Sequence, residues 1–230
     1  MKTIGLIGGM SWESSLLYYR LINEGVKQRL GGLHSAQILM YSVDFEPIEK
    51  LQHSGDWEGA AEVLVDAARR LQAGGADFFL IATNTMHHVA DIVSAAVDIP
   101  LLHIADATAK ILRRDEVRRI GLLGTAFTME FDFYRKRITD QYKIDVVIPE
   151  LHDRQMVHDI IYQELCQGQI EAESREVYLA IIDRLREQEI DGVILGCTEI
   201  GMLLQPQHTE IKLYDTTTIH AQQAVNRALE

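Results

Sequence analysis

Short apolar runs alternate with longer amphipathic segments along the 230-residue chain. The apolar runs carry almost no charge, which is typical of strands buried on both faces of a sheet. The amphipathic segments place apolar residues three and four positions apart and end at glycine or polar residues, as helices do. We expect strands at residues 2–7, 37–43, 78–82, 99–104, 119–123, 144–148, 192–196 and 210–214.

The segments between these runs have mostly helical spacing, and strands that alternate with helices predict a parallel α/β architecture. One connection, residues 44–56, contains Pro47 and Gly55 and is expected to be a loop. The expected helices cover residues 12–30, 58–73, 89–96, 108–114, 131–141, 152–166, 172–188 and 219–229.

The two halves of the chain resemble each other. Residues 4–8 recur as 120–124, and residues 77–83 match 191–197 at a similar offset. A third match, between residues 104–108 and 213–217, follows in the same order. The repeated unit is longer than the periods of solenoid proteins, so we expect two copies of one domain. The alternative is that apolar strands ending in small residues occur in every doubly wound sheet.

Composition narrows the class of partner. Apolar residues make up 47% of the chain and charged residues 24%, as in ordinary globular proteins. The net charge of −12 and the lack of a basic run argue against nucleic acid or a membrane surface as partner. The two cysteines have no metal or redox spacing, and the N-terminal run has no leader pattern, so we expect a cytoplasmic protein without a metal site.

The strand at residues 192–196 ends on a thiol, Cys197. In open α/β sheets, ligands bind just outside the carboxyl ends of the strands, so Cys197 is a candidate nucleophile or base. A free cysteine is also often a small buried hydrophobe, and that alternative stays open. By the internal repeat, Thr83 holds the position in the first half that Cys197 holds in the second.

Three motifs together resemble the aspartate/glutamate racemase family over essentially the whole chain. They are Gly8-Gly9-Met10-Ser11-Trp12-Glu13-Ser14 with Tyr18-Tyr19, Asn84-Thr85-Met86-His87, and Gly196-Cys197-Thr198-Glu199. The branch it resembles acts on L-aspartate and L-glutamate. The resemblance implies two duplicated Rossmann-like domains with parallel four-stranded sheets, related by a pseudo-twofold axis, with the active site in the cleft between them. It implies a first domain of residues 1–105 plus about 210–230 and a second of 106–209, a homodimer, an amino-acid substrate and no cofactor.

The resemblance also implies the chemistry. In that family a cysteine from each half flanks the substrate α-carbon; one removes the α-proton and the other protonates the opposite face. Here Cys197 fills the second position and Thr83 stands in the first, so we expect deprotonation of the L enantiomer by Cys197 and poor reaction of D substrates. A thiol suits this role because its pKa can be lowered towards neutrality at a helix N-terminus.

The remaining site residues follow from the same resemblance. Ser11 also fits an ordinary helix N-cap, Glu199 also fits a solvated carboxylate, His87 is expected to be structural, and Cys166 is expected to be inert packing. The expected substrate-binding residues are Met10, Ser11, Gln52, Asn84, Thr85, Thr125, Thr128, Thr198 and Glu199.

Two other functions remain open on the sequence. A one-cysteine decarboxylase or cis–trans isomerase of small dicarboxylates needs only a single thiol, and a non-catalytic small-molecule binding protein needs none. Nucleotide binding has less support, because residues 5–10 do not form a GxGxxG loop and no GK[ST] follows.

Overall fold

A computed structural model describes residues 1–230 and divides into two compact units. Unit 1 is Met1–Ile104 with His220–Glu230, and unit 2 is Ala105–Ile219. The expected first domain included residues 210–219, whereas the structure assigns them to unit 2. The reason is that strand β7 (Leu213–Asp215) pairs with a strand of the unit 2 sheet.

Unit 1 is built on a parallel sheet of three strands in the order β2-β1-β3. Most of the C-terminal helix α11 (Thr216–Leu229) belongs to this unit as well. Its other elements are β1 (Ile4–Gly8), α1 (Trp12–Leu30), β2 (Ile38–Ser42), α2 (Phe45–Ser54), α3 (Trp57–Ala73), β3 (Phe78–Ile81), the 3-10 helix η1 (Thr85–Val89) and α4 (Ala90–Ala95).

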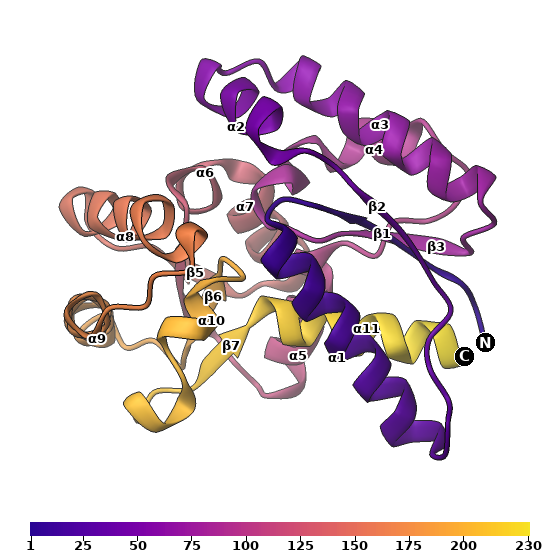
Figure 1. Ribbon diagram of the computed structural model, residues 1–230. Coiled ribbons are helices and arrows are strands. Elements are labelled where there is room, and N and C mark those ends of the chain that lie inside the picture. Colours follow the sequence, from indigo (N-terminus) through magenta and orange to yellow (C-terminus); the bar gives the residue numbers. More distant parts are fainter. The chain divides into compact units, whose positions relative to one another are not determined.

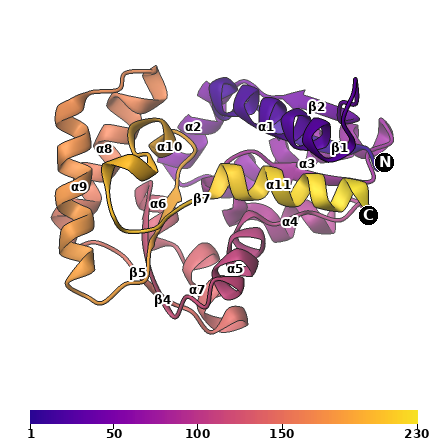
Figure 2. The same cartoon turned by 90° about the horizontal axis from the view of Figure 1, so that it is seen from below.

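Helices cover both faces of the unit 1 sheet (Figure 1). Alternate residues of a strand point to opposite faces, and in β1 Ile7 packs towards α3 and α4 while Ile4 and Leu6 pack towards α1 and α11. Figure 2 shows α1 and α11 side by side. A Cβ at Gly25 of α1 would lie 2.9 Å from Val225 of α11, so this helix crossing requires a glycine.

The predicted strand at residues 99–104 is wrong. Only an isolated bridge between Leu101 and Phe79 forms beside β3. Two histidine side chains bind the backbone that follows Leu101. His220 Nε2 lies 2.8 Å from the Leu102 carbonyl oxygen, and His87 Nε2 accepts from the Ile104 N–H at 3.2 Å. Unit 1 therefore has three strands instead of the expected four.

The predicted loop at residues 44–56 is also wrong, because α2 occupies most of it. Pro47 lies in the first turn of the helix, where a missing N–H costs nothing. Gly55 adopts the left-handed conformation that ends a helix, with φ of 75°. Ile48 and Gln52 are one turn apart on the buried face.

Unit 2 carries a four-stranded parallel sheet in the order β5-β4-β6-β7. Helix α5 (Ile104–Arg114) leads into it and begins four residues before the expected start. The other elements are β4 (Arg119–Gly124), α6 (Ala126–Glu130), α7 (Asp132–Tyr142), β5 (Asp145–Val147), α8 (Leu151–Gln163), η2 (Leu165–Gln167), α9 (Ala172–Arg186), β6 (Val193–Gly196), α10 (Ile200–Leu203) and η3 (Pro206–His208).

The strand order repeats between the units. In each, the first strand lies between the second and the third: β1 between β2 and β3, and β4 between β5 and β6. Beyond β6, Leu213 of β7 pairs with Val193, as Leu101 bridges Phe79 in unit 1. The isolated bridge is thus the reduced counterpart of β7.

None of the helices is long and apolar enough to cross a bilayer.

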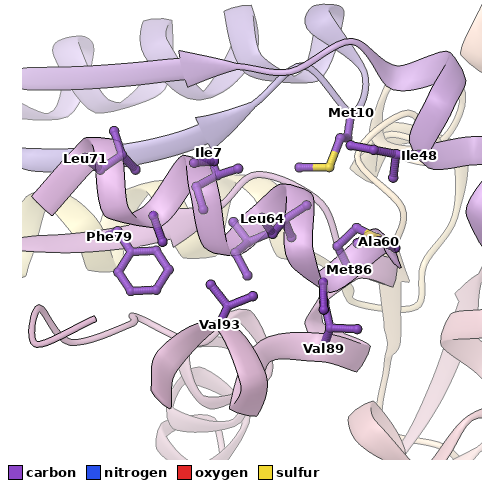
Figure 3. Close-up of a cluster of buried hydrophobic side chains, with 14 of the residues drawn as sticks. Ile7, Met10, Ile48, Ala60, Leu64, Leu71, Phe79, Met86, Val89 and Val93 are labelled. Atoms are coloured by element: carbon purple, nitrogen blue, oxygen red, sulfur yellow. The ribbon is translucent and has the colours of Figure 1, made fainter. Parts of the chain in front are cut away.

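We expect the apolar cluster under α3 to dominate the stability of unit 1. Leu64 is fully buried in this cluster, between Ile7 of β1 and Val93 of α4 (Figure 3). Leu64→Ala should lower the free energy of unfolding by about 3 kcal/mol, through lost burial and the cavity left behind. Urea denaturation followed by circular dichroism measures the change.

The matched control is Leu33→Ala, since Leu33 is fully exposed. It should change the free energy of unfolding by less than about 0.5 kcal/mol. Equal effects of the two substitutions would contradict this account of the core.

Candidate active site

The predicted site residues of unit 1, apart from Gln52, gather at the carboxyl edge of two paired strands. Ile7 of β1 pairs with Ile81 of β3, and the Ala82 N–H donates to the Ile7 carbonyl at 2.9 Å. The turn after β1 carries Met10 and Ser11, and the turn after β3 carries Thr83, Asn84 and Thr85. The structure therefore brings these two turns side by side.

Ser11 has the capping role that the sequence left open. It is the N-cap of α1, and its Oγ accepts from the Ser14 N–H at 3.2 Å. Ser14 Oγ in turn donates to the Ala82 carbonyl at 3.2 Å. The N-terminus of α1 is thereby tied to the residue that precedes Thr83.

Met10 and Gln52 differ from the expectation for a binding surface. The side chain of Met10 is buried and packs with Ile48 in the apolar cluster (Figure 3), which leaves only its backbone to meet a ligand. Gln52 lies on α2 and not in a loop, and its Nε2 donates to Met86 Sδ at 3.0 Å. Its Oε1 is buried and accepts no hydrogen bond from the protein. A buried carbonyl oxygen without a donor costs about 1–3 kcal/mol, and such an oxygen can accept a hydrogen bond from a bound water or ligand.

Unit 2 repeats this arrangement at the ends of β4 and β6. Gly124 and Gly196 are register partners at the last position of the two strands. A Cβ at Gly196 would lie 2.8 Å from the Leu123 carbonyl oxygen, so the backbones approach too closely for any other residue. Thr125 and Cys197 follow these glycines directly and therefore start from neighbouring points.

Thr125 and Thr128 contact each other at the start of α6. Thr125 is the N-cap of α6, and its Oγ1 accepts from the Thr128 N–H at 3.3 Å. The two hydroxyls lie 3.3 Å apart and both residues are buried. His158 of α8, which the sequence analysis did not select, accepts from the Ala126 N–H at 3.1 Å. No motif marks His158, because it lies 32 residues away on another helix.

Cys197, Thr198 and Glu199 form the most compact polar group of unit 2. Cys197 Sγ donates to Glu199 Oε2 at 3.0 Å, and Thr198 Oγ1 donates to the same oxygen at 2.5 Å. Glu199 has only 4% of its surface exposed, so the alternative of a solvated carboxylate is wrong. One carboxylate oxygen thus accepts from both the thiol and the neighbouring hydroxyl.

The environment of Cys197 raises its pKa well above the usual value for a thiol. Burial is the main cause, and the negative charge of Glu199 adds to it because it disfavours a second negative charge nearby. The expectation of a lowered pKa is therefore wrong for the protein without substrate. Helix α10 begins only at Ile200 and has four residues, so it offers little compensating dipole.

Two further side chains lie within electrostatic range of this thiol. The charge of Cys166 contributes to the raised pKa of Cys197. Burial is the main cause of the raised pKa of Tyr178, and the charge of Cys197 adds to it. Tyr178 is fully buried and donates to the Val157 carbonyl at 3.2 Å. The sequence analysis passed over Tyr178, since its helical spacing is that of a core residue.

No three His, Cys, Asp or Glu side chains come together in a way that could hold a metal ion. The candidate residues of unit 1 are hydroxyls and amides, and those of unit 2 are hydroxyls, one thiol and one carboxylate, all of them buried or half-buried. Such a set is suited to hydrogen bonding with a small polar molecule and to proton transfer.

Comparison with known proteins identifies the family. The chain matches the model of the Asp/Glu/Hydantoin racemase family over residues 7–224, which includes all the predicted site residues. The chain belongs to this family. Members of the Asp/Glu/Hydantoin racemase family are isomerases, so the chain is assigned to that class of enzyme.

Individual relatives agree with the family. The structure superposes on that of a Yersinia pestis protein provisionally named an Asp/Glu racemase, with a TM-score of 0.94, 52% identity and 100% of both chains covered. An aspartate racemase homologue from Pyrococcus horikoshii gives a TM-score of 0.87 and 34% identity, again over both whole chains. The broad specificity amino-acid racemase RacX of Bacillus subtilis is 24% identical over 174 residues, 76% of this chain and 74% of that protein.

We expect Glu199→Gln to make Cys197 a stronger nucleophile in the protein without substrate. The substitution removes a negative charge beside the thiol, so the pKa of Cys197 should fall and more thiolate should be present at pH 7–8. Alkylation by iodoacetamide, followed by peptide mass spectrometry, should become several-fold faster at Cys197. Cys166, measured in the same digest, provides the internal reference. Slower or unchanged alkylation of Cys197 would mean that Glu199 does not hold the thiol protonated.

Proposed function

We propose that the chain is a cofactor-independent amino-acid racemase acting on L-aspartate and L-glutamate. Cys197 removes the α-proton of the L enantiomer, and the Thr83 hydroxyl delivers a proton to the opposite face. The names of the relatives support an amino-acid substrate. The Cys197–Glu199 hydrogen bond and the position of Thr83 in the repeat support the division of roles.

The observation that carries the proposal is the equivalence of Thr83 and Cys197. They lie 114 residues apart, which is also the offset of Phe79 from Val193 in the corresponding strands. Each follows the third strand of its sheet, beside the turn that follows the central strand. A racemase needs one proton-transfer group for each face of a planar carbanion, and a duplicated fold supplies such a pair.

The proton of Cys197 has an acceptor at hand. Because the thiol is protonated at rest, it must lose this proton before it can act as a base. Glu199 Oε2, at 3.0 Å, is the group that takes it. The ammonium group of a bound amino acid adds a positive charge, which favours the thiolate and reverses the effect of burial. The thiolate then removes the α-proton of the substrate.

Thr83 makes the second proton transfer the slower one. Its hydroxyl donates its proton to the carbanion while accepting another from water, and the hydroxide that remains is neutralised by the proton that Glu199 took from Cys197 and releases to solvent. A hydroxyl is a far weaker acid than a thiol, so removal of a proton from the D enantiomer is slow, and inversion in either direction is limited by this step. The proposed enzyme therefore exchanges the α-proton of L substrates faster than that of D substrates.

Hydrogen-bond donors replace basic residues in holding the substrate. None of the expected binding residues is lysine or arginine, so the carboxylates are held by hydroxyls and backbone N–H groups. Ser11 and Thr125, the N-caps of α1 and α6, begin the two turns that provide these donors. The unsatisfied Gln52 Oε1 is an acceptor and is suited to the substrate ammonium group.

The proposal predicts selective exchange at the α-carbon. In deuterated water without added cofactor, L-aspartate or L-glutamate should exchange the α-proton, and the D enantiomers should exchange much more slowly. Cys197→Ser should lower L exchange and racemisation by about 10²- to 10⁴-fold, because the hydroxyl is a poor base. Proton NMR of the α-position and chiral chromatography provide the two rates.

Three outcomes would contradict this proposal. Equal α-proton exchange of L and D substrates would contradict the expected preference for the L enantiomer. Retained turnover in Cys197→Ser would show that Cys197 is not the base. Turnover of malonate- or maleate-like acids in place of amino acids would favour the one-cysteine decarboxylase or isomerase. Cys166→Ser is the matched control, and it should keep both activities.

Thr83→Val tests the second proton-transfer group. The substitution keeps the shape of the side chain and removes the hydroxyl, so L exchange through Cys197 should persist while inversion to the D enantiomer falls by about 10²-fold or more. The ratio of inversion to exchange, measured on one sample, is the readout. An unchanged ratio would show that another group protonates the second face.

A further inference from the structure

His87 uses both ring nitrogens to bind the backbone. Its Nδ1 lies 2.8 Å from the Thr83 carbonyl oxygen, and its Nε2 lies 3.2 Å from the Ile104 nitrogen. A backbone N–H can only donate, so Nε2 must be the acceptor. The proton of the neutral ring is then on Nδ1, from which it is donated to Thr83. The hydrogen-bond pattern thus defines a single tautomer.

This histidine closes the turn that carries Thr83. Its backbone N–H donates to the Asn84 carbonyl at 3.0 Å, so backbone and side chain of one residue bind two successive carbonyls, those of Thr83 and Asn84. The ring is buried, with 2% of the residue exposed. Since water does not compete for these bonds, the turn has little freedom to rotate its peptide groups.

Two more buried histidines hold the ring in place. The His87 ring centroid lies 4.5 Å from that of His103 and 6.0 Å from that of His220. His220 donates through Nε2 to the Leu102 carbonyl and accepts at Nδ1 from Tyr18 Oη at 2.9 Å. Burial lowers the pKa of His220 to about 4, so this ring is uncharged at neutral pH. The result is a cluster of three buried imidazole rings behind the Thr83 turn.

We infer that His87 is a positioning residue, which orients Thr83 for proton delivery through the bond to its carbonyl. The inference rests on the proposed role of Thr83. When that bond is lost, the Thr83 peptide gains freedom and its hydroxyl spends less time in line with the carbanion. Cys197 is carried by the sheet of unit 2 and makes none of these bonds, so exchange of the L substrate is not affected in the same way.

The inference is tested by two substitutions that each keep one of the two ring hydrogen bonds. In His87→Asn the side-chain amide reaches the position of Nδ1 and can still donate to the Thr83 carbonyl. In His87→Gln the amide reaches the position of Nε2 and can still accept from Ile104, but the donor to Thr83 is lost. The pair therefore separates orientation of Thr83 from support of the fold.

The readout is the ratio of inversion to α-proton exchange for the L substrate. His87→Gln should lower inversion by about ten- to a hundredfold with exchange within about twofold of the parent protein, and His87→Asn should restore most of the inversion. Only folded molecules contribute to either rate, so the ratio is independent of the folded fraction. If His87→Gln does not fold, His87→Ala, which removes both ring hydrogen bonds, takes its place. A loss of inversion with retained exchange then supports the inference, and a ratio of inversion to exchange near that of the parent protein overturns it.

Measuring Thr83→Val in the same assays distinguishes the proposed function of Thr83 from the positioning role of His87. If Thr83→Val leaves inversion intact, the proposed function of Thr83 fails and the inference fails with it. If Thr83→Val loses inversion but His87→Gln keeps the ratio of the parent protein, only the positioning role is overturned. A parallel loss of inversion and exchange in His87→Gln also overturns it, since that is the result expected from structural damage.

Discussion

Parallel pairing of the two central strands is the interaction on which each unit depends. In unit 1 it joins β1 to β3, and in unit 2 it joins β4 to β6. Strands that run in the same direction end at the same edge, so the turns that follow them are neighbours without any further interaction. The polar residues of those turns are brought together by the backbone hydrogen bonds of the paired strands. Helices packed on the unit 1 sheet and glycines at the ends of β4 and β6 then set how closely the turns approach.

Much of this architecture can be predicted from the sequence, because buried parallel strands have an apolar run that few other structures share. The ends of the apolar runs indicate where the strands end, and they therefore place Thr83 and Cys197 just after two of the strands. The segment at residues 99–104 has the same apolar character, yet its backbone is bound by His87 and His220. His220 lies 118 residues from its backbone partner, so no local pattern could have indicated this.

The error at Cys197 has a different cause. Its motif identifies the residue but says nothing of the dielectric around it, and burial outweighs the helix terminus in setting the pKa. A buried thiol beside a carboxylate carries little thiolate at neutral pH, so it reacts slowly with reagents in the solvent. In the proposed reaction, substrate binding is the event that makes Cys197 available as a base.

The C-terminal helix has a consequence for the order in which the chain folds. Residues 220–230 belong to unit 1, where His220 binds Tyr18 and Leu102 and Val225 packs against Gly25. These residues leave the ribosome only after all of unit 2 has been made. Unit 2 is a continuous segment and can complete its sheet during synthesis. Unit 1, although it is begun first, keeps one face of its sheet without α11 until residues 220–230 have been made, and the apolar residues on that face stay uncovered by this helix for that interval.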